Sequence, residues 1–378
     1  MQHIVFYEPA YMERHQHIWV LRGGIRYKSI LGDLRRRAKL TILMSRLPPG
    51  SDPHRVSLED EFGVEFVEMR SEELINPLFA HELAGDLVAA LKPLKPTVVS
   101  NLNGRGIGFC YASAMAAEAL GVDYVWRMGG NDLEARGAKA ERTLNPFWGT
   151  KHYFDRLVQE RVAAHVARNI IVMSERERIR LASMTADASK IDVCVRGVDH
   201  AHFRPAPGRT FERCRRLLFI GRRSLEKGYD ILEDAMQGLA TTAPALSASF
   251  AGTFDVGETG NRRYVGFVDY ADLPAVYNAH DVVVVCSRSE GFPQVIMEAM
   301  SCGLPCILTR GLFHQDFVDG ESCLLADLTP GGLAAVITRL AQDDALYQRL
   351  AESSLRVARE KFSDRDNRAR YHDILLAD

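Results

Sequence analysis

Short apolar runs alternate with helix-length amphipathic runs from one end of this 378-residue chain to the other. This alternation predicts an α/β fold with parallel sheets built from strand–helix units. In the first half, strands are expected at residues 3–8, 40–45, 64–69, 97–102, 124–128, 169–173 and 191–195. In the second half, they are expected at residues 217–221, 247–251, 264–267, 282–286, 305–308 and 323–326. Helices are expected between the strands, for example over 77–91 and 107–120.

The chain length and a break in this pattern predict two domains. A chain of 378 residues is long for a single hydrophobic core. Residues 197–213 contain two prolines and two glycines, show little periodicity, and are expected to form a linker. The N-terminal domain would then cover residues 1–196 and the C-terminal domain residues 214–362. The last segment, 363–378, is expected to be helical.

Composition and charge narrow the class of protein. The chain is 47% hydrophobic and 25% charged, as a globular protein is, and its net charge of -2 gives no case for nucleic-acid binding. The N-terminus does not have the pattern of a signal peptide, and no run of about 18 apolar residues predicts a membrane span. The seven cysteines are scattered, which indicates reduced, buried thiols in a cytosolic protein and no metal site.

Residues 287–306 carry the most specific chemical signal. A buried strand ends in a polar turn that holds Glu290, and the helix that follows holds Glu298, eight residues later. Open α/β sheets bind ligands at this edge, where two carboxylates accept hydrogen bonds from sugar and ribose hydroxyls. The amides of Gly291 and Phe292, in the turn that ends with Pro293, and those of the helix start would donate to an anionic group such as a diphosphate. The alternative is a pair of solvated carboxylates at helix ends.

Residues 218–230 form a second motif of this kind. They read as a strand, a turn that begins with Gly221, and a helix start, with Arg222 and Lys227 at the turn. A guanidinium and an ammonium group beside free helix amides suit a diphosphate. The alternative, two surface cations at a helix N-terminus, would oppose the helix dipole. Arg223 could be a plain surface residue.

The two motifs resemble the Glu-x7-Glu and Gly-Arg…Lys-Gly motifs of retaining GT-B glycosyltransferases, of the type gathered in glycosyltransferase family 4. The expected linker is also similar to a signature of that family, at Gly197-Val198-Asp199 and Phe203-Arg204-Pro205. Arg196 replaces the asparagine that the family usually carries before this glycine.

The resemblance implies roles for four side chains. Glu290 would contact the hydroxyls of the donor sugar, and Glu298 would bind the ribose. Arg222 and Lys227 would neutralise the departing nucleoside diphosphate. Arg222, Lys227 and Glu290 are therefore the expected catalytic residues.

The resemblance also implies a fold and a reaction. Two Rossmann-like domains would face a central cleft, with the acceptor bound by the N-terminal domain, which the C-terminal helix would rejoin. The C-terminal domain would bind a UDP- or GDP-linked sugar. The sugar would pass to an acceptor hydroxyl with retention, without a protein nucleophile, a metal ion or another cofactor. Bacterial glycan, glycolipid or natural-product glycoside synthesis is the expected setting.

Further donor contacts are expected from glycine-containing turns. Gly266 and Phe267 resemble the strand-turn whose backbone contacts the nucleobase in the family, although the connection over residues 252–263 is shorter than usual. Gly24, which follows Gly23 after the first strand, allows the backbone to approach a phosphate closely.

The N-terminal half departs from the family at one position. The histidine that faces the donor sugar in the family aligns with Gly129, so its side-chain contact would be absent. Asn131 and Asp132 are nearby polar substitutes, and Asp132 could equally cap a helix. His17, two residues after His15, is expected in a polar, acceptor-binding loop.

Arg35, Arg36, Arg37 and Lys39 form a basic cluster near the end of the first expected helix. These cations could complement the helix dipole. They could also contact anionic lipid headgroups, which would place the protein at the inner face of the membrane.

Two other functions fit the same motifs. A sugar-nucleotide epimerase or hydrolase of this fold would turn over the donor without an acceptor. A non-catalytic protein that binds nucleotide sugars is the other alternative, and Gly129 favours it.

Overall fold

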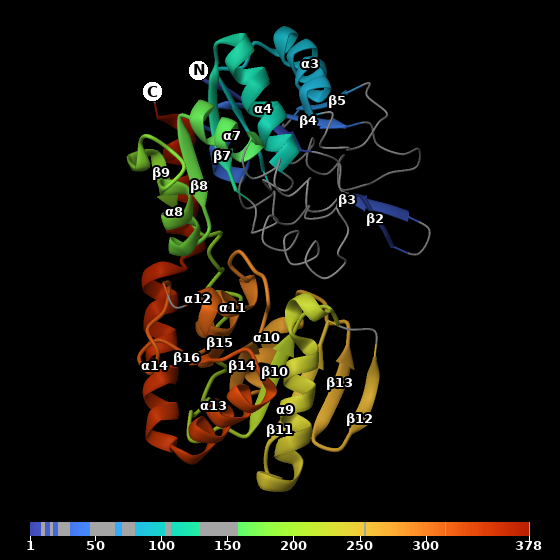
Figure 1. Cartoon of the computed structure of the whole chain (residues 1–378), viewed down its shortest axis with the longest axis vertical. Coiled ribbons are helices and arrows are strands. Elements are labelled where there is room, and N and C mark those ends of the chain that lie inside the picture. Colours follow the sequence, from blue (N-terminus) through green and yellow to red (C-terminus); the bar gives the residue numbers. More distant parts are fainter. Residues whose placement is uncertain are drawn as a thin grey trace. The chain divides into compact units, whose positions relative to one another are not determined.

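The protein forms two compact α/β units (Figure 1). The computed structural model describes residues 1–8, 12–15, 18–21, 31–45, 65–69, 80–102, 107–128, 158–252, 255–313 and 315–377. The first unit comprises Met1–Met173, Glu177–Cys194 and Arg368–Asp378, and the second comprises Ser174–Arg176 and Val195–Asn367.

The first unit is built on a parallel sheet. Its described strands form the order β5-β4-β1-β6-β7-β8-β9, and all neighbours pair in parallel. The chain therefore builds outward from β1 in one direction and then in the other. The strands are β1 (His3–Glu8), β4 (Lys39–Ser45), β5 (Glu65–Met69), β6 (Val98–Ser100), β7 (Asp123–Arg127), β8 (Asn169–Val172) and β9 (Ile191–Val193).

Helices pack on both faces of this sheet. Val5 and Tyr7 of β1 enter one core, whereas Ile4 and Phe6 enter the other. This alternation is expected for a strand that is buried on both faces. The first core contains α3 (Ala80–Leu91), α4 (Ile107–Leu120), α7 (Glu160–Val166) and α8 (Glu175–Ala182), and the second contains the helical residues 31–34 and α15 (Asp364–Leu376).

The second unit repeats the plan. Its described strands form the order β12-β13-β11-β10-β14-β15-β16, parallel except for the antiparallel edge pair β12–β13. The strands are β10 (Arg216–Ile220), β11 (Ser247–Ala251), β12 (Val256–Thr259), β13 (Arg262–Gly266), β14 (Val282–Val285), β15 (Cys306–Thr309) and β16 (Leu324–Ala326).

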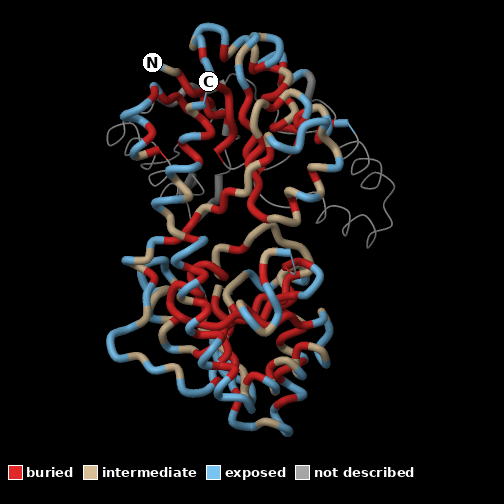
Figure 2. The backbone as a smooth tube through the Cα atoms, turned by 90° about the vertical axis from the view of Figure 1, so that its left-hand side faces the viewer, coloured by how far each residue is buried: buried red, intermediate tan, exposed pale blue. Residues whose placement is uncertain are grey.

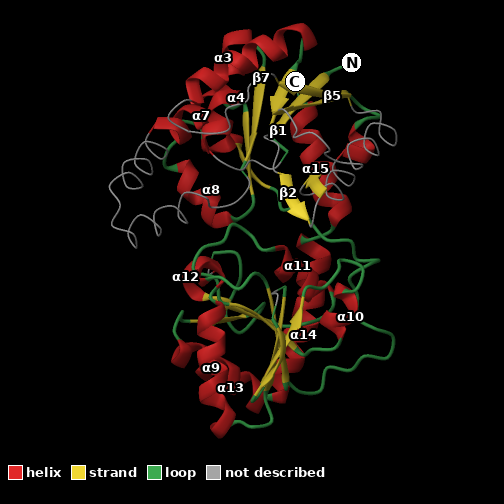
Figure 3. Cartoon of the chain, turned by 90° about the vertical axis from the view of Figure 1, so that its right-hand side faces the viewer, coloured by secondary structure: helices red, strands yellow, loops and turns green. Residues whose placement is uncertain are grey.

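The helices of the second unit also lie on both sides of its sheet (Figure 3). Leu217 and Phe219 face one core, and Leu218 faces the other. In each unit, the buried residues gather in the interior and the exposed ones lie at the periphery (Figure 2). The helices are α9 (Tyr229–Thr242), α10 (Leu273–Asn278), α11 (Gln294–Ser301), α12 (Arg310–Phe313), α13 (Pro330–Gln342) and α14 (Asp344–Lys361).

The predicted α/β alternation is confirmed, since every strand expected from the sequence is present within a few residues of its predicted bounds. Two hairpins were not predicted. β2 (Met12–His15) pairs with β3 (Ile18–Leu21), so His15 ends a strand and does not lie in a polar loop. β12 and β13 form the second hairpin in the short connection after β11.

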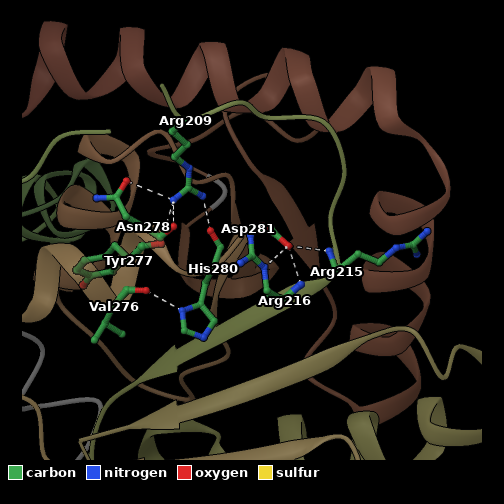
Figure 4. A network of polar contacts seen from close by, with 8 residues as sticks. All are labelled: Arg209, Arg215, Arg216, Val276, Tyr277, Asn278, His280 and Asp281. Atoms are coloured by element: carbon green, nitrogen blue, oxygen red, sulfur yellow. Dashed lines mark hydrogen bonds and ion pairs between the residues drawn. The ribbon is translucent and has the colours of Figure 1, made fainter. Parts of the chain in front are cut away.

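Residues 197–213, expected to be a linker, are packed into the second unit. Phe203 is fully buried, and its carbonyl oxygen accepts a 2.6 Å hydrogen bond from the hydroxyl of Ser301 on α11. The guanidinium of Arg209 donates to the carbonyl oxygens of Asn278 and His280 at the end of α10 (Figure 4). These contacts satisfy helix-terminal acceptors that would otherwise lack partners.

The C-terminal helix α15 begins in the second unit and ends in the first. Tyr371 and Leu375 are buried in the first unit's core, and the Arg127 guanidinium lies 5.0 Å from the ring centroid of Tyr371. Arg37 of the basic cluster forms a 2.9 Å ion pair with Asp373. Part of the cluster is therefore engaged by α15. No described helix combines the length and the apolar composition that a membrane span requires.

The start of the former linker region meets the start of α15 at Gly197. Its φ is +76°, and a β-carbon there would lie 2.5 Å from the α-carbon of Asp364. Val198 and Ser363 form a parallel β-bridge at the same place. Gly208 has a similar φ of +73° with no atom within 4 Å of a built β-carbon.

A side chain at Gly208 would therefore strain only the backbone, whereas one at Gly197 would also collide with Asp364. We expect Gly208→Ala to lower the free energy of unfolding by about 1–2 kcal/mol, the cost of the left-handed conformation. Gly197→Ala should cost about 3 kcal/mol or more, because the backbone must also move. Urea titrations followed by circular dichroism measure both. Equal losses would contradict the close approach of Gly197 to Asp364.

Candidate functional site

The predicted site lies at the carboxyl ends of β10 and β14, which are neighbours in the second sheet. After β10 the chain continues to β11 and β13 on one side, and it later returns to β14 on the other side. The order of strands therefore reverses between β10 and β14. Open α/β sheets bind ligands at such a switch point, outside the carboxyl ends of the strands.

Lys227 and Glu290 meet at this switch point. Lys227 ends the short 3-10 helix η5 (Leu225–Lys227) after β10, and Glu290 lies in the turn between β14 and α11. Although they are 63 residues apart in the sequence, the ammonium group donates a hydrogen bond to Glu290 Oε2. The two side chains are 26% and 17% exposed, so the pair remains accessible to a ligand. The structure thus brings two of the predicted catalytic residues together.

The backbone beneath this pair is tightly packed. Gly228 has a φ of +69°, and a β-carbon at this position would lie 1.7 Å from the carbonyl oxygen of Cys286. The Cys286 thiol donates a 3.1 Å hydrogen bond to the carbonyl oxygen of Gly228. Only glycine fits this contact, which holds the turn after β10 against the end of β14.

The two arginines after Gly221 differ in their surroundings. Arg222 is 67% exposed and lies 3.5 Å from Glu226, so it is free to reorient toward a ligand. Arg223 forms a 2.9 Å ion pair with Asp255, and its guanidinium lies 5.0 Å from the ring centroid of Tyr229. The surface role that the sequence left open for Arg223 agrees with these contacts.

Glu298 occupies a more enclosed position than the sequence indicated. It lies on α11 with 5% exposure, and its Oε2 accepts a 2.7 Å hydrogen bond from the hydroxyl of Tyr277 on α10. Burial, together with the charge of Glu298, raises the pKa of Tyr277 well above its ordinary value. The hydroxyl therefore stays protonated and donates to the carboxylate. Glu298 is therefore more enclosed than Glu290, whose side chain is 17% exposed.

The start of α11 offers backbone donors beside Glu290. Pro293 is the N-cap, with φ −70° and ψ 130°, and its side chain has no acceptor for the helix amides. The Ile296 amide donates to the Pro293 carbonyl oxygen at 3.1 Å, whereas the amides of the first two helical residues, Gln294 and Val295, have no acceptor within their own helix. Phe292 stacks on Phe317 at 5.8 Å and packs against Phe362, which anchors the turn that begins at Gly291.

The expected base-contacting residues lie at the same edge of the sheet. The Gly221 amide donates to the carbonyl of Ala251 at 2.9 Å, and the Gly252 amide donates to the carbonyl of Gly266 at 2.8 Å. These bonds extend the ladder past the strand ends. Phe267, which follows Gly266, is 72% exposed.

Five residues expected in the first unit's part of the site lie outside the described residues: Gly24, His17, Gly129, Asn131 and Asp132. Arg127, at the end of β7, is described and is 4% exposed. Its guanidinium donates to the carbonyl of Leu102 and lies against Tyr371, so it is engaged in the core of its unit.

The sequence analysis missed two partners of the site. Tyr277 lies on a short helix and carries no motif. Arg288 binds Asp230 across 58 residues of sequence, with bonds of 2.7 and 2.6 Å. Spacing along the chain gives no signal for either pairing, because both depend on which strands and helices become neighbours. Among the described residues, no group of three or more His, Cys, Asp or Glu side chains is arranged to hold a metal ion.

The chain is similar in sequence to known proteins. Residues 214–343 match the family model for glycosyl transferases group 1. The D-inositol 3-phosphate glycosyltransferase of Thermomonospora curvata is 30% identical over 238 residues, which cover 54% of this chain and 55% of that protein. The chain spans about half the length of the curated relatives it matches.

Solved structures resemble the whole chain. HepE from Anabaena, in complex with UDP, has a TM-score of 0.71 at 18% identity and covers 99% of both chains. Sucrose-phosphate synthase from Thermosynechococcus elongatus has a TM-score of 0.72 at 17% identity, with 99% of this chain and 98% of that chain covered. At these identities the likeness shows the fold alone. Over residues 214–343 this chain is therefore similar to the glycosyl transferases group 1, and it has the GT-B fold.

Proposed function

We propose that this protein is a retaining glycosyltransferase that moves a sugar from a nucleoside-diphosphate sugar to an acceptor hydroxyl. The observation that carries the proposal is the contact between Lys227 and Glu290 at the switch point of the second sheet, beside the start of α11. The cation and the helix amides suit the diphosphate of such a donor, and the carboxylate suits its sugar hydroxyls.

Lys227 and Arg222 would stabilise the negative charge on the departing diphosphate. Lys227 is already at the site, and the exposed Arg222 would leave Glu226 to reach the phosphates. The amides at the start of α11 would add hydrogen-bond donors, and the helix dipole favours an anion there. Preorganised donors of this kind act where charge develops in the transition state.

The carboxylates would hold the two hydroxyl-bearing parts of the donor. Glu290 would accept hydrogen bonds from the sugar, and Glu298 from the ribose. The proposed mechanism has the diphosphate leave and the acceptor attack on the same face, through an oxocarbenium-like state, without a protein nucleophile or a metal ion.

We infer that the donor is UDP-linked, with GDP as the other candidate. Structures of HepE from Anabaena, which has the same fold, are in complexes with UDP and with UDP-glucose. The base would lie near Gly266 and Phe267, where backbone contacts can serve either base. We place the reaction in the cytoplasm, in the synthesis of a bacterial glycan, glycolipid or glycoside, and the seven buried cysteines suit a reducing compartment.

Calorimetry with UDP, GDP, ADP and dTDP tests the donor site. We expect one ribonucleotide to bind at micromolar Kd. Glu298→Gln and Tyr277→Phe should each weaken it about tenfold or more, because a hydrogen bond to a charged group contributes about 1.5–3 kcal/mol. Both variants should also reduce the preference for UDP over 2′-deoxyUDP. Wild type that binds no nucleotide would defeat the proposed function, and an unchanged preference would defeat the ribose contact.

Turnover tests the ion pair. We expect Lys227→Met and Glu290→Gln each to lower kcat about 100- to 1,000-fold, since removal of one preorganised polar or charged group from an active site has effects of about that size. The assay measures release of UDP or GDP from the nucleotide sugar that the wild type consumes. Arg356→Gln, which breaks an exposed pair with Glu360 on α14, is the matched control. An unchanged rate in either site variant would refute the assignment.

Chelation tests the proposed metal independence. Because Lys227 and Arg222 are proposed to supply the positive charge, excess EDTA should leave kcat unchanged. A loss of turnover that Mg²⁺ or Mn²⁺ restores would show that a metal ion shares this role.

Turnover of the donor at full rate without any acceptor would favour an epimerase or hydrolase over a transferase. Tight nucleotide binding without turnover would favour a binding protein.

A further inference from the structure

The two turns that carry Lys227 and Glu290 are joined by a third residue, Arg288. Its backbone amide donates a 2.8 Å hydrogen bond to the carbonyl oxygen of Glu226. Its guanidinium donates to both carboxylate oxygens of Asp230, at 2.7 and 2.6 Å, and also to the carbonyl oxygen of Leu225. Arg288 thus binds the turn after β10 through its main chain and its side chain.

The residues that Arg288 contacts lie on both sides of Lys227 in the sequence. Leu225 and Glu226 immediately precede Lys227, and Asp230 lies three residues after it, in the first turn of α9. Arg288 lies two residues before Glu290. A shift of Arg288 would therefore move the backbone that carries Lys227 relative to the backbone that carries Glu290.

The chemistry of the pair suits positioning more than stabilisation. Arg288 and Asp230 are 25% and 38% exposed, and partly solvated ion pairs contribute little to folding. A two-bond guanidinium–carboxylate contact nevertheless fixes direction as well as distance. A lysine would keep the charge but lose the fork geometry.

A second pair links the same two strands at their opposite ends. Arg216, at the start of β10, donates to Asp281, just before β14, at 2.7 Å (Figure 4). Asp281 also accepts from the backbone amides of Arg215 and Arg216. This pair joins β10 to β14 away from Lys227 and Glu290, so it provides a control with the same chemistry.

We propose that Arg288, held by Asp230, is a positioning residue that sets the geometry between Lys227 and Glu290. Its catalytic consequence rests on the proposed function. Its structural consequence, that Lys227 is held against Glu290 only while Arg288 is in place, is independent of activity.

Kinetics provide the first test, with the nucleotide sugar that the wild type consumes. Arg288→Gln and Asp230→Asn should each lower kcat about 10- to 100-fold, with KM changed less than about threefold, since small misplacements of reacting groups have effects of this order. Arg288→Lys should give an intermediate kcat. Arg216→Gln should keep the wild-type kcat even if its Tm falls. An unchanged kcat in Arg288→Gln would overturn the proposal.

A double mutant separates positioning from a general loss of structure. If Arg288 acts through Lys227, then Arg288→Gln should lower kcat little further in a Lys227→Met background. If Arg288→Gln instead lowered kcat by the same factor in the Lys227→Met background as in the wild type, the proposal would be overturned. A loss of kcat in Arg288→Gln that is matched by the fraction of unfolded protein in circular dichroism would also overturn it.

Chemical labelling makes the test independent of turnover. Lys227 is paired in the wild type, so its acetylation by limiting acetic anhydride should rise several-fold in Arg288→Gln and stay at the wild-type level in Arg216→Gln. Mass spectrometry of the peptide that contains Lys227 measures this. Unchanged labelling in Arg288→Gln would overturn the positioning role. A wild type that consumes no nucleotide sugar would defeat the proposed function and leave the labelling result to decide the role of Arg288.

Discussion

The carbonyl oxygen of Cys286 lies so close to Gly228 that a β-carbon on residue 228 would be only 1.7 Å from it. This close approach depends on the sheet order, because β10 and β14 are parallel neighbours whose carboxyl ends meet at one edge. Where the two turns are in contact, their side chains form two ion pairs: Lys227 with Glu290, and Arg288 with Asp230. The contact between Gly228 and Cys286 therefore brings together the turns that carry both ion pairs of the site.

The helices behind this edge position the second carboxylate in a different way. Glu298 is held by the hydroxyl of Tyr277, and Tyr277 packs edge-on against Phe203 at 5.8 Å. The carbonyl of Phe203 accepts from Ser301, which lies on the same helix as Glu298. The segment expected as a free linker is thus part of the support for α10 and α11. Glu298 is fixed by packing, whereas Glu290 is fixed by an ion pair that a ligand can reach.

Periodicity along the chain was sufficient for the parallel strands of both sheets, because parallel strands that are buried on two faces are continuously apolar, as Val282–Val285 is. It was insufficient for β12, whose four residues are all exposed and include a glycine. The motifs identified Lys227 and Glu290 separately, but their contact depends on strand order. The burial of Glu298 and the bond between Arg288 and Asp230 likewise depend on tertiary neighbours, which local patterns do not encode.

The pairing of Lys227 with Glu290 also constrains how the site can treat its ligand. An ammonium group that is hydrogen-bonded to a carboxylate attracts a phosphate less strongly. This attraction recovers when the carboxylate accepts hydrogen bonds from other donors. Sugar hydroxyls are such donors. In the proposed reaction, a complete nucleotide sugar would satisfy both partners at once, whereas a free diphosphate would leave Glu290 competing for Lys227. Binding of the sugar would then strengthen the interaction of Lys227 with the leaving group, so that binding energy away from the breaking bond assists the reaction.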